Sequence, residues 1–182
     1  MISPTDILHA KILIVDDRVA NISLLDAMLR DAGYVSISST TDSNKACDLH
    51  SKHRYDLILL DLEMPRLNFS GFQVMERLKE IEAGGLLPVI AITAHPEYKL
   101  KALQAGARDF ISKPFDLPEL LARIHNMLEA RMFLLEMQGY IKSLEEKIRE
   151  TAAGRNLMLR HHDETDGTCD VRSAIEGGSS HA

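Results

Sequence analysis

Asp61 stands directly after an apolar run that is typical of a buried strand, where a carboxylate is costly unless it has a function. Three further apolar runs also end in polar residues, the first in Asp16 and Asp17, the others in Thr93 and Lys113. Acids, a hydroxyl and an ammonium are the groups that bind a divalent cation and a phosphoryl group. We therefore expect phosphoryl chemistry at these four run ends.

If the runs are neighbouring strands, Asp16, Asp17 and Asp61 converge and repel one another, and a hard cation such as Mg²⁺ relieves that repulsion with oxygen ligands. Asp61 is the best candidate nucleophile, since in-line attack on a phosphodonor gives an acyl phosphate. Lys113 would pair with one phosphoryl oxygen and Thr93 would donate its hydroxyl to another. A cis bond after Lys113 would direct the ammonium inward.

Each of these residues alone has an ordinary explanation. A single aspartate after a strand, such as Asp17, most often caps a helix or forms a turn. Thr93 could cap the following helix, and Lys113 could be a solvated loop charge. The functional prediction depends on the complete set, in this order and each at a strand end.

Short apolar runs alternate with helical patterns from residue 11 to about 128. Five such strand–helix units predict an α/β fold with a doubly wound, five-stranded parallel sheet and helices on both faces. Ligands of these folds bind at the carboxyl ends of the strands, where the polar residues lie. The expected strands are 11–15, 35–39, 56–61, 87–92 and 109–112, and the expected helices are 19–32, 42–50, 71–81, 96–105 and one from about 117.

The last helical pattern continues beyond the expected domain of residues 9–128. Apolar residues recur there at a and d positions over about three heptads: Met127, Ala130, Leu134, Met137, Ile141, Leu144 and Ile148. We expect residues 129–153 to form a dimeric, parallel coiled coil, although a helix that folds back on its own domain is the alternative. Residues 154–182 are predicted to be an acidic, disordered tail.

Composition limits the possible classes of protein. The 182 residues carry a net charge of -6, which argues against nucleic-acid binding by the bulk surface. Membrane-spanning apolar runs and a secretory signal are lacking, so we expect a cytoplasmic protein with no membrane partner. Cys47 and Cys169 lack metal-ligand spacing and are expected to be free thiols.

The motifs together resemble the receiver domain of two-component response regulators over about residues 9 to 130. The residues that carry the resemblance are Val15-Asp16-Asp17, Asp61 with Met64-Pro65, Thr93-Ala94 and Lys113-Pro114-Phe115. It implies a CheY-like fold and phosphorylation of Asp61 by a histidine kinase or phosphotransfer protein. It also implies Mg²⁺ held by Asp17, Asp61 and the Glu63 backbone carbonyl, with Asp16 acting through a metal-bound water.

The resemblance further implies a switch, in which the Thr93 hydroxyl moves inward and Phe110 follows it. Phe110 lacks the hydroxyl of the usual tyrosine, so its inward state would depend on packing alone. Intersubunit salt bridges of a homodimer are expected from Lys99, Asp109, Glu119 and Arg123. Exposed pairs are worth about 0–1 kcal/mol each, so the coiled coil should contribute more to dimerisation.

Two features depart from the usual receiver pattern. The segment between Pro65 and Gly71 is about two residues longer than the common loop, which would alter access to Asp61. Glu63 and His95 occupy the variable positions that flank the phosphoryl site, where a carboxylate could orient or repel attacking water.

Several alternative functions share some of these sequence features. A phosphatase of the haloacid dehalogenase type needs an aspartate where Glu63 stands, and a flavin module needs a Ser/Thr/Gly-rich loop after the first strand. A phosphate-indifferent dimeric scaffold stays open, as does a receiver fragment of a regulator with a cyclic-dinucleotide enzyme or kinase effector. A helix-turn-helix pattern is lacking, so direct DNA binding is not expected. The preferred hypothesis is a phosphoacceptor without its own catalytic output.

Overall fold

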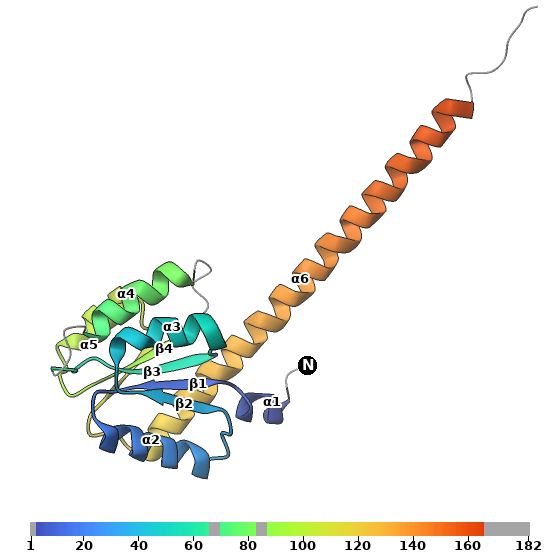
Figure 1. Ribbon diagram of the computed structural model, residues 1–182. Coiled ribbons are helices and arrows are strands. Elements are labelled where there is room, and N and C mark those ends of the chain that lie inside the picture. The colour runs from blue at the N-terminus through green and yellow to red at the C-terminus, as the bar shows by residue number, and fades with distance from the viewer. Residues whose placement is uncertain (1–2, 66–69, 83–86, 166–182) are drawn as a thin grey trace, which may run out of the picture. The chain divides into compact units, whose positions relative to one another are not determined.

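The sheet of this protein has five parallel strands in the order β2-β1-β3-β4-β5 (Figure 1). The computed structural model describes residues 3–65, 70–82 and 87–165. This strand order confirms the predicted doubly wound fold, and its switch point lies between β1 and β3. The elements are α1 (Pro4–Leu8), β1 (Ile12–Val15), α2 (Val19–Asp31), β2 (Ile37–Thr40), α3 (Ser43–His53), β3 (Leu57–Asp61), α4 (Gly71–Ile81), β4 (Val89–Thr93), α5 (Tyr98–Ala105), β5 (Asp109–Ser112) and α6 (Leu117–Thr165).

The three inner strands are buried along their whole length, whereas the edge strands β2 and β5 are partly exposed. Helices cover both faces of a parallel sheet, which explains why the inner strands are continuously apolar in sequence. The edge strand β2 was predicted at 35–39 but begins at Ile37, because the Val35 N–H donates to the Leu8 carbonyl outside the sheet. Similarly, β4 begins at Val89 instead of Leu87, since Pro88 has no N–H to donate to the sheet.

Side chains of each inner strand alternate between two hydrophobic cores. Leu13 and Val15 pack with α3, α4 and α5, whereas Ile12 and Ile14 pack with α1, α2 and α6. Figure 1 shows the corresponding helices on opposite faces of the sheet. Burial of each large apolar side chain contributes about 1.5–3 kcal/mol, so these two cores hold the strand ends in fixed positions.

The start of α4 packs directly against the end of β3. Ser70 and Gln73 form a capping box, which satisfies N–H groups at the start of the helix. A Cβ atom on Gly71 would lie 2.5 Å from the carbonyl oxygen of Asp61 and 2.9 Å from the Cα of Leu62. Glycine at this position therefore permits the backbone of α4 to approach the strand that carries Asp61.

Helix α1 was not expected from the sequence. Ser3 caps it, and the Asp6 carboxylate accepts a hydrogen bond from the Ser3 N–H at 2.8 Å. Ile7 is buried in the core that α2 and α6 share. The capping-box spacing of Ser3 and Asp6, with Pro4 at the first helical position, was the available signal.

The chain divides into two compact units, Met1–Met137 and Gln138–Ala182, whereas the sequence places the end of the domain at residue 128. Helix α6 belongs to both units. Its first part buries Leu120, Ile124 and Leu128, and Met127 also packs against this core. Because these turns pack within the domain, only the later apolar residues of α6 could pack against a second helix.

Every described side chain of α6 from Phe133 to Ala152 is exposed. The helix continues to Thr165, whereas the sequence predicts a disordered tail from residue 154. Residues 166–182 lie outside the described residues.

Only one of the two cysteines lies in the described part of the chain. Cys47 is free and buried between α3 and α4, whereas Cys169 lies outside the described residues. Among residues 3–65, 70–82 and 87–165, no helix has both the length and the apolar character that crossing a bilayer requires.

Candidate functional site

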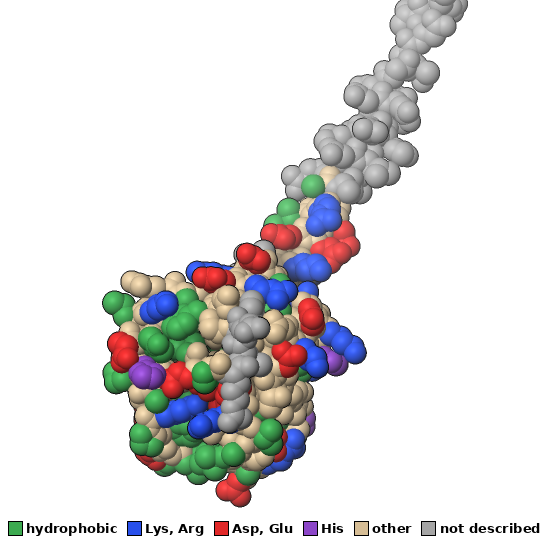
Figure 2. Space-filling view, turned by 60° about the vertical axis from the view of Figure 1, so that its left-hand side comes forward, with side chains coloured by type: hydrophobic (Ala, Val, Ile, Leu, Met, Phe, Trp, Pro, Cys, Tyr) green, Lys and Arg blue, Asp and Glu red, His purple; other side chains and the backbone are tan. Residues whose placement is uncertain are grey.

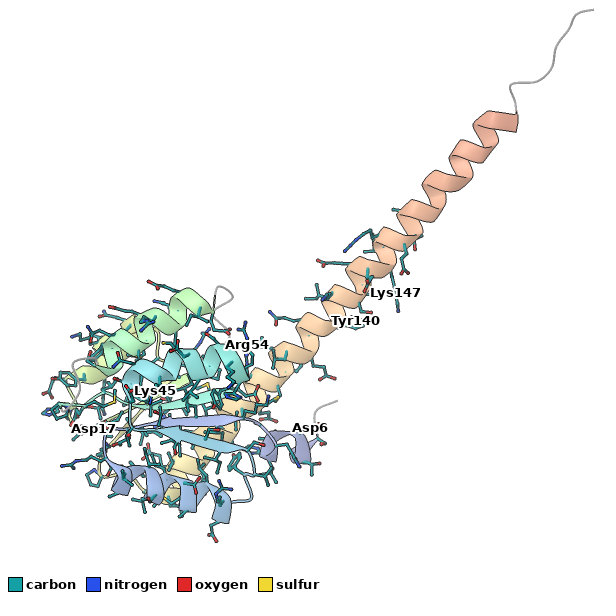
Figure 3. The ribbon with its side chains drawn as sticks, in the orientation of Figure 1. Asp6, Asp17, Lys45, Arg54, Tyr140 and Lys147 are labelled. Carbon is teal, nitrogen blue, oxygen red and sulfur yellow. The ribbon has the colours of Figure 1, made fainter. Side chains whose placement is uncertain are left out.

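Three carboxylates meet at the carboxyl edge of the sheet. Asp16 and Asp17 follow β1, and Asp61 ends the adjacent strand β3, where Val15 pairs with Leu60. Each carboxylate offers an oxygen that lies within 4.8 Å of the others. Figure 3 labels Asp17 at this edge. The convergence expected from the sequence is therefore present.

Asp61 is buried, with 2% of its surface exposed. Burial raises the pKa of Asp61 to about 6, the Lys113 ammonium opposes this rise, and repulsion by Asp16 adds to it. A carboxylate is thus held in a place where its charge is poorly solvated. A cation bound beside it would favour the ionised form.

The hydrogen bonds of Asp16 and Asp17 differ. Asp16 accepts the Arg18 N–H at 2.9 Å, and the Asn21 amide donates to both of its oxygens at 2.9 and 3.0 Å. In contrast, the buried Oδ1 of Asp17 has no hydrogen-bond partner among the described residues. An unpaired buried carboxylate oxygen among three acids fits a hard divalent cation such as Mg²⁺.

Lys113 brings a positive charge to the same edge. Its Nζ lies 3.1 Å from Asp61 Oδ1 and 3.5 Å from Asp16 Oδ2. The backbone N–H of Lys113 donates to the Thr93 carbonyl at 2.8 Å, and the bond to Pro114 is cis, as anticipated. The ammonium is therefore directed into the acidic cluster instead of into solvent.

Thr93 ends β4, and its fully buried hydroxyl donates to Glu63 Oε1 at 2.7 Å. The N–H of Ala94 donates to the same oxygen, also at 2.7 Å. Burial alone would raise the pKa of Glu63, but these two hydrogen bonds, together with attraction from His95 and Lys113, hold that pKa below its ordinary value. His95 Nε2 lies 3.9 Å from the other carboxylate oxygen of Glu63.

Side chains of the acidic cluster, Glu63 and Lys113 line a cavity of about 290 Å³. Figure 2 shows acidic and basic side chains close together on the side of the molecule where the inner strands end. The cavity is large enough for a cation together with a phosphoryl group. Its lining residues are Asp17, Arg18, Asn21, Asp61, Glu63, Pro65, Ala94 and Lys113.

The residues expected to form the switch and dimer surface make contacts within this one chain. Phe110 is half-buried, and Lys99 Nζ lies 4.6 Å above the centre of its ring. Arg123 donates to Asp109 at 2.8 and 3.0 Å and lies 2.8 Å from Glu119. Their pairing between subunits stays a prediction.

The sequence reasoning missed two side chains of the site. The sequence predicts a helix over Asn21 but no role for its side chain, although its place in the first turn of α2, five residues after Asp16, was a usable signal. For Glu63, the backbone carbonyl was predicted as a metal ligand, but the binding of its side chain to Thr93 was not. Most of the longer loop that was predicted to alter access, residues 66–69, lies outside the described residues.

Comparison with known proteins places this geometry in a family. The sequence matches the response regulator receiver domain over residues 12–125. It is 32% identical to the DNA-binding dual master transcriptional regulator RpaA of Synechocystis, covering 83% of this chain and 66% of that one. It is 35% identical to the response regulator PleD of Caulobacter vibrioides, covering 72% of this chain and 29% of PleD. The chain thus spans less than two thirds of either relative.

A solved structure supports the same assignment. The receiver domain of the sensor histidine kinase PA1611 from Pseudomonas aeruginosa, which has a magnesium ion coordinated in its active-site cleft, is 31% identical. The superposition has a TM-score of 0.60 and covers 66% of this chain and 98% of that domain. The matched family extends over more than half of the sequence and includes the carboxylates, Thr93 and the strand ends that position them. This chain belongs to the response regulator receiver domain family.

Proposed function

We propose that this protein is a phosphoacceptor response regulator of a two-component phosphorelay, which receives a phosphoryl group on Asp61 from a histidine kinase or phosphotransfer protein. The observation that carries the proposal is the position of the Asp61 carboxylate. It is buried, contacts the Lys113 ammonium at 3.1 Å, and lies beside two further carboxylates. Receiver domains use such an acidic site for Mg²⁺-dependent phosphorylation of an aspartate.

The residues present fit a bound Mg²⁺. Asp17, Asp61 and the backbone carbonyl of Glu63 would hold the cation, and Asp16 would act through a metal-bound water. When bound, Mg²⁺ supplies positive charge that offsets the charge of the three acids and of the phosphoryl oxygens. Two observations support this proposal: Oδ1 of Asp17 has no hydrogen-bond partner in the described part of the chain, and the PA1611 receiver has a magnesium ion coordinated in its active-site cleft.

The side chains of the site have separate roles in the proposed transfer. An Asp61 oxygen attacks phosphorus in line, so that a new O–P bond forms while the bond from phosphorus to the donor breaks and the donor leaves with that electron pair. Lys113 pairs with the incoming phosphoryl group, and Thr93 donates its hydroxyl to it. Asn21 holds Asp16 by hydrogen bonds to both of its oxygens, which keeps this acid from turning away from the site.

Replacement of Asp61 by asparagine tests the proposal. Wild-type protein incubated with acetyl phosphate and Mg²⁺ should gain the mass of one phosphoryl group, and D61N should gain none. The matched control is D48N, which removes an exposed carboxylate on α3. The proposed function is wrong if D61N is labelled as fully as the wild type, or if the wild type is never labelled.

We further propose that residues 129–153 form a dimeric coiled coil. Leu134, Met137, Ile141 and Leu144 are between 39% and 51% exposed, and Ile148 is 68% exposed. Apolar side chains repeated at a and d positions leave an unfavourable stripe in a monomer, and a second helix would bury it. The receiver core is complete without these residues, which argues for a second chain as the partner.

The proposed output surface connects the phosphorylation site with this helix. Movement of Thr93 would change the packing of Phe110 on the neighbouring strand, and thereby the contact between Phe110 and Lys99. The pairs of Arg123 with Asp109 and Glu119 would then exchange for pairs between subunits, because each is partly exposed and available for exchange. A mutation that removes Arg123 should weaken dimerisation less than one in the coiled coil.

A second candidate is a receiver that controls an effector domain on the same polypeptide, such as a cyclic-dinucleotide enzyme or a kinase. The lengths of the relatives favour it, since the match spans only 29% of PleD. An antibody against this chain would detect a native protein much heavier than 20.4 kDa in that case. A native mass equal to that of the chain would reject it.

A further inference from the structure

One carboxylate oxygen of Glu63 accepts hydrogen bonds from two donors of the site. The Thr93 hydroxyl and the Ala94 N–H both reach Oε1 at 2.7 Å. These donors stand side by side at the end of β4, and Glu63 and Ala94 line the same cavity as Asp61 and Lys113. Two donors that converge on one anionic oxygen form a small anion-binding site, which the protein fills with its own side chain.

A phosphoryl group on Asp61 would compete with Glu63 for this pair of donors. A hydroxyl has a single proton and donates one strong hydrogen bond at a time, so Thr93 cannot serve both acceptors. The Glu63 side chain is only 26% exposed, and its negative charge would repel the incoming phosphoryl oxygens at short range. Glu63 must therefore move before the donors can bind the phosphoryl group.

We infer that Glu63 is an internal latch, which keeps Thr93 and Ala94 occupied in the resting protein and slows phosphorylation of Asp61 until its carboxylate turns out to solvent. This inference rests on the proposed function of Asp61. The displacement requires no backbone movement, because Glu63 contributes only its side chain to the latch. The backbone carbonyl proposed as a metal ligand stays in place.

The latch predicts a gain of function when Glu63 is shortened. With acetyl phosphate and saturating Mg²⁺, E63A should be phosphorylated at least roughly tenfold faster than the wild type, because the two charge-assisted hydrogen bonds from Thr93 and Ala94 no longer have to be broken. E63Q keeps an acceptor oxygen but loses the charge, so its rate should fall between the two. The apparent affinity for beryllofluoride, measured with Mg²⁺ at equilibrium, should increase in the same order.

Glu97 provides a matched control. Its carboxylate lies 2.9 Å from His95 Nδ1 in the same segment, but it is 63% exposed and accepts no hydrogen bond from Thr93 or Ala94. The variant E97Q removes the same charge close to the site, and its phosphorylation rate should stay within about twofold of the wild type. An equal gain in phosphorylation rate in E97Q and E63A would show that negative charge near the site repels acetyl phosphate in general, and would overturn the latch.

The other outcomes separate the latch from the proposed function. If the wild type is labelled and E63A is no faster, or is slower, the latch is wrong and the role of Asp61 stands. If the wild type, E63A and E63Q all remain unlabelled, both proposals are overturned. Loss of folding would lower the rate and cannot imitate a gain, and the unfolding temperature of each variant checks it.

Discussion

The ammonium of Lys113 lies 3.1 Å from the Asp61 carboxylate, although Asp61 ends β3 and Lys113 follows β5, and these two strands are not neighbours. Strand β4 separates β3 from β5 in the sheet, so the ion pair crosses its end. This contact is the main attraction that opposes the burial of Asp61. It also places a positive charge where the phosphoryl group would arrive.

Replacement of Lys113 by methionine keeps much of the side-chain volume but removes the charge. We expect phosphorylation by acetyl phosphate to become at least about tenfold slower, because the phosphoryl oxygens lose a charge-assisted contact. The rate of label incorporation in the presence of Mg²⁺ measures this effect. The control K52M changes an exposed lysine on α3 and should leave the rate unchanged. A wild-type rate in K113M would remove Lys113 from the site.

The raised pKa of Asp61 predicts an unusual dependence of stability on pH in metal-free protein. The pKa of Asp61 in the folded state is about 6, above its ordinary value of 3.8, so the folded state binds the proton more tightly than the unfolded state. The contribution of Asp61 to stability is therefore fully present below about pH 4 and is lost as the pH rises through about 6. The loss should be roughly 3 kcal/mol.

Urea unfolding in EDTA at a series of pH values measures this contribution as the difference between the wild type and D61N. D61N should be more stable than the wild type at pH 7, and the difference should shrink towards pH 4. Added Mg²⁺ should stabilise the wild type more than D61N above pH 6, since the ionised carboxylate is the ligand. A difference that does not vary with pH would contradict the raised pKa of Asp61.

Much of the fold and the carboxylate cluster could be predicted, for two physical reasons. Inner strands of a parallel sheet are buried on both faces, so their apolar runs stand out in the sequence. Their carboxyl ends lie along one edge, so Asp16, Asp17, Asp61 and Lys113 had to be close together once the sheet was assigned. Burial of Asp61 followed from its strand being central.

Side-chain directions could not be predicted in the same way. Whether Glu63 points to solvent or to Thr93 depends on the distance between two strand ends, and no residue pattern reports it. The pairs of Arg123 with Asp109 and Glu119 satisfy within one chain the charges that were expected to bind a second chain. Helix α1 was not predicted because a five-residue helix has too few apolar positions to show a helical period.

Gly71 permits a test of how closely α4 must approach the active site. The Cβ of G71A would meet two backbone atoms at 2.5 and 2.9 Å, and backbone cannot move aside as cheaply as a flexible side chain. We expect G71A to lower the free energy of unfolding by roughly 1–3 kcal/mol. Chemical denaturation measures this loss. Since one of the two atoms is the Asp61 carbonyl oxygen, phosphorylation should slow as well.

Gly139 is the matched glycine for this comparison. A Cβ there would meet no atom of the described residues within 4 Å beyond the adjoining backbone of its own helix, and the residue lies inside helix α6. G139A should therefore stabilise the helix, by about 1 kcal/mol, instead of destabilising the protein. Equal losses of stability in G71A and G139A would show that helix packing against β3 is not the cause.

The proposed coiled coil predicts that charges in its seam dissociate the dimer. Ile141 and Leu144 are 51% and 39% exposed in the single chain and would be buried in the dimer. The double variant I141E/L144E should weaken dimerisation at least about hundredfold, because it loses four buried apolar side chains per dimer. Sedimentation equilibrium measures the dissociation constant. K142E alters the neighbouring exposed position and should dimerise like the wild type.

The same measurement decides between a switch and a constitutive scaffold. If phosphorylation acts through Thr93, Phe110 and the surface of α5, beryllofluoride with Mg²⁺ should tighten the wild-type dimer but leave that of D61N unchanged. Exposed ion pairs contribute about 0–1 kcal/mol each, so a two-to-tenfold change in the dissociation constant is the expected size. A constant that is insensitive to beryllofluoride would make the helix a permanent dimerisation element, and Asp61 would then have to signal through contacts with another protein. A monomer under both conditions would reject the coiled coil itself, because its exposed apolar stripe would then need a different partner.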